Sequence, residues 1–250
     1  FDRNADITII EKQKYPQYSL CGLPYALSKD IDNFEKLIIF PKEFYEKQKI
    51  NLLLNKEIKK IDTNSKRVIL DDDSKIEYDS LILSTGAIPC NYKIDYKYPK
   101  GVYFIRSLDD AKELSNKIDN SKKAIIYAYG WGCKAGCKGC ISGRISLEMA
   151  YALKKRGLDL TIVSKENRPL RQQIDPDMSE LIVEYMGEKG ISLVTDKSVI
   201  NIAGEDKVSG LIADDELIGA DIIIMASGTR TNNSLAKDCG IEIQKGIKAN

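Results

Sequence analysis

The sequence predicts an α/β protein built from two similar units, each with a parallel sheet and a small antiparallel insert. Two pairs of stretches repeat each other at long range: residues 6–12 (DITIIEK) match 159–165 (DLTIVSK), and residues 79–86 (DSLILSTG) match 221–228 (DIIIMASG). Each stretch holds a short apolar run rich in β-branched residues, which is typical of buried parallel strands. A chain of 250 residues is long enough for two domains, each with its own core.

Composition excludes several classes of function. Lys and Arg number 38 against 37 Asp and Glu, and this net charge of +1 gives no reason to expect a nucleic-acid partner. No apolar run has the length of a membrane span and no signal peptide is visible, so we expect a cytoplasmic protein without a membrane partner. The chain has no histidine, which excludes Ser-His-Asp and Cys-His hydrolysis and histidine-ligated metal sites.

The first unit begins with a predicted strand over residues 7–10, which ends at Glu11. An acidic residue at such a strand end is where dinucleotide-binding folds hold a ribose hydroxyl. Cys21 follows ten residues later, in the run SLCGLPY. Two interpretations of this thiol stay open: a small buried core residue, or a redox or nucleophilic group near a cofactor.

The middle sections of the two units also correspond. Residues 51–70 and 192–212 each predict a strand followed by a small antiparallel hairpin region. The second unit adds a strand over 124–127 and a helix that ends near Gly157, which completes a βαβ dinucleotide unit. The first unit lacks this strand, loop and helix, so we expect roughly thirty residues to precede Phe1 and the chain to be a fragment.

A further helix is predicted to begin at Asp175-Pro176, where Asp175 can cap and proline suits the first helical position. Its apolar positions recur at helical spacing and predict core packing. They are Met178, Leu181, Ile182, Tyr185 and Met186.

Taken in order, several motifs resemble the pyridine nucleotide–disulfide oxidoreductase family. The resemblance is greatest to its single-cysteine branch, which holds coenzyme A-disulfide reductases, NADH oxidases and persulfide reductases. The motifs span nearly the whole chain: CGLPY at 21–25, STGA at 84–87, VYFIRSLDDA at 102–111, SLEMA at 146–150, DPDM at 175–178 and GTRTN at 228–232.

The resemblance implies two Rossmann-like domains that bind FAD and NAD(P)H, with parallel sheets and small antiparallel β inserts. The FAD-binding domain would comprise residues 1–105, without its first strand and glycine loop, and residues 232–250 would return to it. The NAD(P)-binding domain would comprise residues 106–231 and carry an insertion at 127–139. An interface domain beyond residue 250 would make the full-length protein a homodimer.

The resemblance also assigns roles to single residues. Cys21 would be the redox thiol beside the flavin, and Ser164 would occupy the position that selects between NADH and NADPH. With no carboxylate at Ser164, and with Lys165 and Arg168 nearby, NADPH is favoured over NADH. The residues implied to contact FAD are Glu11, Lys12, Ile58, Ser84, Thr85 and Gly86, and those implied to contact the pyridine nucleotide are Gly143, Glu148, Ser164, Lys165 and Gly228.

The implied activity is flavin-dependent reduction of a small-molecule disulfide or persulfide, similar to coenzyme A disulfide, through Cys21. No second cysteine follows within five residues, so the disulfide of the two-cysteine branch is absent. Two alternatives stay open. One is an NADH oxidase that reduces oxygen through a sulfenic acid at Cys21. The other is a truncated remnant without catalytic activity.

The second nucleotide loop departs from the family pattern. A GxGxxG loop ahead of Glu148 needs glycines at 141, 143 and 146, and only Gly143 is present. The upstream insertion YAYGWGCKAGCKG offers a second glycine pattern at 130–136, but a helix following it would run through two glycines. We therefore favour a distorted loop around an insertion.

The insertion and the residue after it contain three cysteines with CxxxCxxC spacing: Cys133, Cys137 and Cys140. This spacing resembles the iron–sulfur triad of radical S-adenosylmethionine enzymes, and three thiolates could also hold zinc. No fourth ligand is evident and the rest of that family's pattern is missing. We therefore predict no metal site, and we expect Cys90 and Cys239 to be inert.

Overall fold

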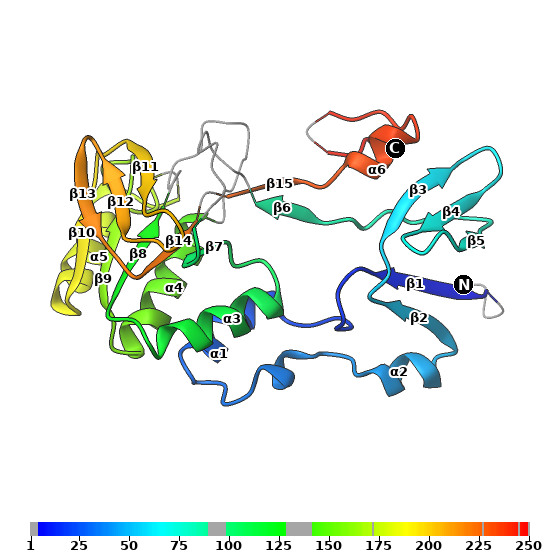
Figure 1. Cartoon of the computed structure of the whole chain (residues 1–250), viewed down its shortest axis with the longest axis horizontal. Coiled ribbons are helices and arrows are strands. Elements are labelled where there is room, and N and C mark those ends of the chain that lie inside the picture. The colour runs from blue at the N-terminus through cyan, green and yellow to red at the C-terminus, as the bar shows by residue number, and fades with distance from the viewer. Residues whose placement is uncertain are drawn as a thin grey trace. The chain divides into compact units, whose positions relative to one another are not determined.

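The computed structural model describes residues 5–89, 99–128, 142–171, 173–226, 228–244 and 246–249. The chain divides into two compact units (Figure 1). Unit 1 comprises Phe1–Ser19, Glu35–Ile88 and Thr231–Asn250, and unit 2 comprises Leu20–Phe34 and Pro89–Arg230. The mixed α/β architecture with parallel and small antiparallel sheets confirms the predicted fold class.

Unit 2 is organised around a five-stranded parallel sheet with the order β10-β9-β8-β14-β7. Its strands are β7 (Val102–Tyr103), β8 (Lys123–Tyr127), β9 (Asp159–Val163), β10 (Ile191–Val194) and β14 (Ile222–Met225). All four residues of β14 are buried, as are four of the five in β8. Continuous apolar strands of this kind belong to the centre of a parallel sheet that is covered on both faces.

Helices cover one face of this sheet and an antiparallel insert covers the other. The helices of unit 2 are α1 (Leu23–Leu27), α3 (Leu108–Ile118), α4 (Ser142–Lys155) and α5 (Pro176–Glu188). α4 packs against β8 and β9, and α5 packs against the edge strand β10. The insert is a three-stranded sheet of β11 (Val199–Ala203), β12 (Gly210–Ala213) and β13 (Glu216–Gly219). Ile202 and Leu211 from the insert share one buried cluster with Ile125, Val163 and Ile223 of the parallel sheet.

Unit 1 holds a two-stranded parallel sheet of β1 (Ile7–Glu11) and β2 (Ile50–Leu54), with α2 (Lys42–Lys47) packed on β2. An antiparallel sheet of β3 (Ile58–Asp62), β4 (Arg67–Leu70) and β5 (Lys75–Glu77) builds its core with α6 (Ser234–Asp238). Short 3-10 turns occupy Leu20–Gly22 and Phe34–Leu37. Where the chain passes between the units, β6 (Ala87–Pro89) pairs with β15 (Thr229–Thr231).

The structure supports the internal duplication in detail. Both inserts are antiparallel three-stranded sheets with strands in sequence order. Both also have an irregular register after the first residue of the first strand, between Ile58 and Lys60 in unit 1 and between Val199 and Asn201 in unit 2. A β-bulge retained at the same place in two copies is a shared structural feature, because bulges fix how a strand bends.

Two predictions about burial are wrong. The run 7–10 does form a parallel strand, but Ile7 and Ile9 are 49% and 38% exposed, because in the described part of unit 1 only β2 pairs with β1. The apolar stripe of α5 is mostly surface, with Leu181 and Tyr185 57% and 59% exposed and Met178 49% exposed. α5 packs against the edge strand β10. Its apolar stripe is wider than this contact, so Met186 is buried while other residues of the stripe stay exposed.

Local expectations about the helices are largely confirmed. α4 ends before Gly157, which has a φ of +84°. α5 begins at Pro176 after Asp175, as predicted, although the Asp175 side chain forms no capping hydrogen bond. No helix within the described ranges combines the length and apolar character that a bilayer crossing requires.

We expect the insert of unit 2 to be essential for its stability. Leu211 is fully buried between the insert and the parallel sheet, so Leu211→Ala should lower the free energy of unfolding by about 2–5 kcal/mol. Leu217 lies on the adjacent strand and is 62% exposed, so Leu217→Ala should change it by about 0.5 kcal/mol or less. Urea unfolding of both variants measures the difference, and equal losses would contradict the packing described.

Candidate functional site

The predicted site residues fall into two groups, one in each unit. Unit 1 holds the residues implied for FAD, and unit 2 holds Cys21 together with the residues implied for the pyridine nucleotide. Within unit 2 the parallel register brings several of them to one edge of the sheet. Tyr127, Val163 and Met225 are paired neighbours at the ends of β8, β9 and β14, so the residues that follow them leave the sheet side by side. In open parallel sheets this carboxyl edge is where ligands bind.

Ser164 is the first residue after β9 and is fully buried. Its Oγ accepts a hydrogen bond from the backbone N–H of Glu166 at 3.0 Å, which fixes the turn at this edge. Glu11 makes the same turn at the end of β1, where its Oε1 accepts from the N–H of Gln13 at 2.8 Å. The two units thus share one backbone arrangement that carries a carboxylate in unit 1 and a hydroxyl in unit 2.

The cations near Ser164 differ in what they contact. Lys165 is exposed and directly follows Ser164. Arg168 donates instead to the carbonyls of Ile174 and Arg171 and to the hydroxyl of Ser179, with distances of 2.6–3.1 Å. These contacts join the loop after β9 to the start of α5. Arg168 is therefore a loop-stabilising residue in this conformation, and Lys165 is the cation left at the strand end.

Cys21 lies in the 3-10 turn Leu20–Gly22, directly before α1, and its side chain is exposed. It is a free thiol. This exposure excludes the interpretation of Cys21 as a buried core residue. Leu23, Ala26 and Leu27 of α1 are buried and anchor the turn to the rest of unit 2.

Arg156 joins three helices at the end of α1. Its Nη1 donates to the carbonyl of Leu27 at 2.8 Å and approaches the Ser115 hydroxyl at 3.4 Å, and its Nη2 donates to Asp119. Only 7% of the arginine side chain is exposed, whereas its partner Asp119 is 61% exposed. The guanidinium holds the pKa of Asp119 below its usual value. Arg156 fixes where α1 ends against α3 and α4.

A second polar cluster links α4 to the residues after α1. Asp30 accepts from the Tyr151 hydroxyl at 2.9 Å and from the Ser28 hydroxyl at 2.6 Å, and it pairs with Lys155. The Lys155 ammonium, followed by the two hydroxyls, lowers the pKa of Asp30 to about 2. The same contact raises the pKa of Lys155. Sequence reasoning missed this cluster, although Glu148, Tyr151 and Lys155 recur at the spacing of one helix face.

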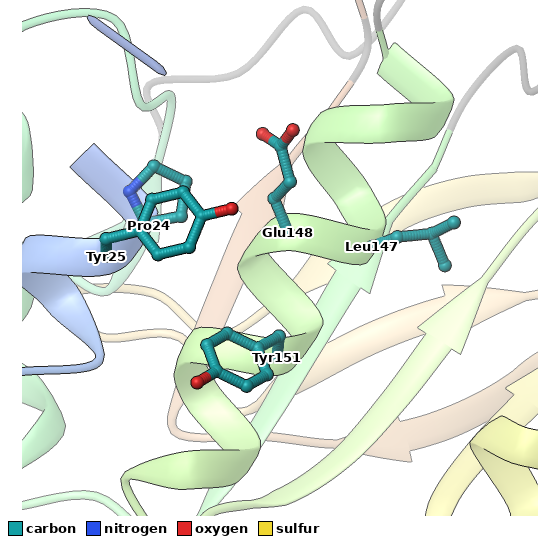
Figure 2. A pocket seen from close by; sticks show the side chains of 5 residues that line it. All are labelled: Pro24, Tyr25, Leu147, Glu148 and Tyr151. Carbon is teal, nitrogen blue, oxygen red and sulfur yellow. The ribbon is translucent and has the colours of Figure 1, made fainter. Parts of the chain in front are cut away.

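A pocket of about 260 Å³ lies between α1 and α4. Figure 2 shows Pro24 and Tyr25 of α1 facing Glu148 and Tyr151 of α4. Leu147 completes the lining. Glu148, implied to contact the pyridine nucleotide, thus shares a pocket with residues three and four positions after Cys21.

In unit 1 the implied FAD residues lie at two places. Glu11 ends β1, and Lys12 beside it forms an exposed ion pair with Glu57 at 2.8 Å. Ile58 opens β3 and packs against the unit 1 core. Because this side chain is apolar, Ile58 could contact FAD only by packing against it or through its backbone.

The second place in unit 1 is the segment after residue 79. Residues 80–83 form no strand, although the matching segment of unit 2 is β14. β14 bonds to β8, whereas the described part of unit 1 offers no strand equivalent to β8. Thr85 donates its hydroxyl proton to the carbonyl of Asn232, whose N–H in turn donates to Gly86 O at 3.0 Å. Ser84 is exposed, and Gly86 takes a left-handed φ of +66°.

The remaining predicted residues are placed individually. Gly143 is buried in the first turn of α4, and Gly228 precedes β15 with a φ of +81°. Position 141 of the predicted glycine loop, the second glycine pattern at 130–136, nearly all of the insertion, Cys90 and the three cysteines from 133 to 140 lie outside the described residues, whereas Gly143 and Ser146 of the predicted loop lie inside α4. Cys239 is half-buried and its thiol contacts the carbonyl of Ala236 at 3.3 Å. Within the described ranges no group of acidic or cysteine side chains is arranged to hold a metal ion.

Two copies of a parallel sheet with an antiparallel insert, each with predicted site residues at the carboxyl edge of its strands, are the architecture of a two-domain dinucleotide-binding protein. The chain belongs to the pyridine nucleotide-disulphide oxidoreductase family, whose model matches residues 2–250. This confirms the family indicated by the sequence motifs.

Individual relatives span the same class. The chain is 33% identical to an NADH oxidase from Methanocaldococcus jannaschii over 98% of its own length and 53% of the relative. It is 29% identical to a CoA-dependent NAD(P)H sulfur oxidoreductase from Pyrococcus abyssi over 95% of its length and 51% of the relative. The solved NAD-dependent persulfide reductase from A. fulgidus superposes with a TM-score of 0.87 at 26% identity, covering 97% of this chain and 44% of that structure. The chain spans about half the length of these relatives.

The Asp30 cluster predicts a pH dependence. The pKa of Asp30 is lowered from 3.8 to about 2 on folding, so its stabilising effect is complete above about pH 4 and is lost as the pH falls through 2. In urea unfolding between about pH 5 and pH 2.5, the advantage of the wild type over Asp30→Asn should shrink as the pH falls. A constant difference between wild type and Asp30→Asn would contradict the assignment.

Proposed function

We propose that the protein is an FAD-dependent NAD(P)H oxidoreductase that reduces a small-molecule disulfide or persulfide through Cys21. The observation that carries this proposal is the exposed, free thiol of Cys21 on a turn anchored in the same unit as Glu148. The named activities of the relatives, an NADH oxidase and a CoA-dependent sulfur oxidoreductase, support the redox class.

Unit 1 would bind FAD and unit 2 would bind NAD(P)H. The Glu11 carboxylate, held at the end of β1 by the N–H of Gln13, fits a ribose hydroxyl donor. Gly86 leaves the backbone open beside Thr85, because its positive φ and missing side chain allow close approach of a ligand. In unit 2 the carboxyl edge at Ser164 and the face of α4 at Glu148 would hold the pyridine nucleotide.

In this reaction Cys21 is the residue that forms and then loses a covalent bond to the substrate. Its thiolate attacks one sulfur of a disulfide substrate, forms a new S–S bond to that sulfur and expels the other sulfur as a thiolate. The two electrons that cleave this mixed disulfide would come from FAD held in unit 1, once NAD(P)H has reduced it. The cleavage returns Cys21 as a thiolate and releases the second half of the substrate as a thiol after protonation. A single cysteine suffices because the substrate provides the other sulfur.

Oxygen reduction is the second candidate, favoured by the relative named as an NADH oxidase. Cys21 would then cycle between thiolate and sulfenic acid, for which an accessible thiol is equally suited. Anaerobic reduction of the full-length protein, followed by addition of either coenzyme A disulfide or oxygen, separates the two candidates by which oxidant restores the oxidised flavin spectrum faster.

Replacement of the thiol tests the proposed nucleophile. In the full-length protein Cys21→Ser should lower turnover of coenzyme A disulfide by more than about 10³-fold, as removal of a nucleophile usually does. NAD(P)H-dependent reduction of an artificial dye, which takes electrons without Cys21, should persist. Cys239→Ser is the matched control and should retain both activities. Full disulfide turnover in Cys21→Ser would show that the proposed nucleophile is wrong.

We further propose that NADPH is preferred over NADH. Ser164 offers no carboxylate to a ribose 2′-hydroxyl, and Lys165 can attract a 2′-phosphate. Ser164→Glu would reproduce in unit 2 the turn that Glu11 makes in unit 1, so it should shift kcat/KM towards NADH by about tenfold or more. Ser164→Ala adds no charge and should leave the ratio nearly unchanged. An unaltered ratio in Ser164→Glu would place the selecting group elsewhere.

A further inference from the structure

The segment that carries Cys21 is too short to hold its own position. The 3-10 turn has three residues and α1 has five, whereas an isolated helix of this length is unstable in water. Its buried side chains hold it against α3 and α4. Apolar burial is non-directional, however, so it resists separation more than sliding or rotation. Directional contacts must therefore set where Cys21 points.

One such contact is the bond from Arg156 to the carbonyl of Leu27, and a second set converges on Asp30. The Ser28 hydroxyl lies 2.6 Å from the Asp30 carboxylate and 3.0 Å from the carbonyl of Tyr25, and the N–H of Ile31 donates to the same carbonyl at 3.0 Å. Asp30 is thereby connected to the backbone of α1 at Tyr25, which lies four residues after Cys21. Ser28 thus connects Asp30 to Tyr25, which lines the pocket with Glu148.

The other end of the connection is α4. Lys155 pairs with Asp30, and the Tyr151 hydroxyl donates to it at 2.9 Å. The Lys155 ammonium also lies 5.6 Å from the Tyr151 ring, so the three side chains restrain one another. Tyr151 and Lys155 share an exposed helix face with Glu148. Lys154, the preceding residue, turns away and donates to the carbonyl of Gly190 at 2.9 Å.

We propose that Asp30 and Lys155 are positioning residues for the Cys21 thiol, fixing α1 against the nucleotide-side helix α4. This inference rests on the proposed function of Cys21. The pair touches neither substrate nor cofactor in the proposed reaction, and it acts through the direction of α1. Breaking it should misplace the thiol while leaving the binding of the pyridine nucleotide and electron transfer to the flavin intact.

The test compares two activities of the full-length flavoprotein. Lys155→Met and Asp30→Asn should each lower coenzyme A disulfide turnover by about tenfold, a loss expected from a small misplacement of a reacting group. Reduction of the artificial dye by NADPH should be unchanged, and so should the KM for NADPH. Lys154→Met, which removes the same charge from the same helix, should keep both activities.

A charge swap distinguishes positioning from general destabilisation. Combining Asp30→Lys with Lys155→Asp restores the ion pair with its charges exchanged and should recover most of the lost disulfide turnover. The rate of Cys21 alkylation by iodoacetamide should change in the single variants and return towards wild type in the swap. The inference is overturned if the single variants retain disulfide turnover while Cys21→Ser loses it, or if dye reduction falls in parallel. Retained turnover in Cys21→Ser would instead overturn the proposed function.

Discussion

The structure of unit 2 depends on the two faces of one helix, α4. Its buried face packs on β8 and β9, the two strands whose carboxyl ends form the predicted nucleotide edge. Its other face carries Glu148, Tyr151 and Lys155 and receives the segment that holds Cys21. Because 3.6 residues per turn place these three side chains on one surface, a single rigid element relates the thiol to the nucleotide edge. The Cys21 turn accordingly belongs to unit 2 by its contacts, although strand β1, which precedes it in the chain, lies in unit 1.

Duplication explains what the units share, and the neighbouring strands explain where they differ. The inserts agree down to the position of a register irregularity, because an antiparallel hairpin sheet is stabilised by its own strands. Parallel strands need partners from distant parts of the chain. β14 lies between β8 and β7, whereas the matching residues 80–83, which are also mostly apolar, form no strand. Strand propensity is therefore insufficient without a neighbour to accept the backbone hydrogen bonds.

Local signals in the sequence predicted much of this fold, and contacts between distant segments account for what they missed. The strand at Ala124, the start of α5 at Pro176 and the end of α4 before Gly157 follow from periodicity and capping, which neighbouring residues decide. The exposure of Leu181 and Tyr185 could not be predicted, because periodicity shows that a helix has an apolar face but not how wide a partner covers it. Similarly, the Asp30–Lys155 pair joins residues 125 positions apart, and no local pattern encodes it.

The loop after β9 shows why a charge near a site is weaker evidence than its hydrogen bonds. From sequence, Lys165 and Arg168 appear equivalent as candidates for a 2′-phosphate. In the structure Arg168 makes three hydrogen bonds within the loop and to α5, so using it for a ligand would break contacts that stabilise the loop. Arg171 is exposed but pairs with Glu166 at 3.1 Å, so a phosphate there would compete with a carboxylate. For Lys165, binding a phosphate would break neither hydrogen bonds of this kind nor an ion pair with Glu166. Because Ser164 and Glu11 make the same turn, the difference between a hydroxyl and a carboxylate at this one position, next to one lysine, accounts for the proposed cofactor preference.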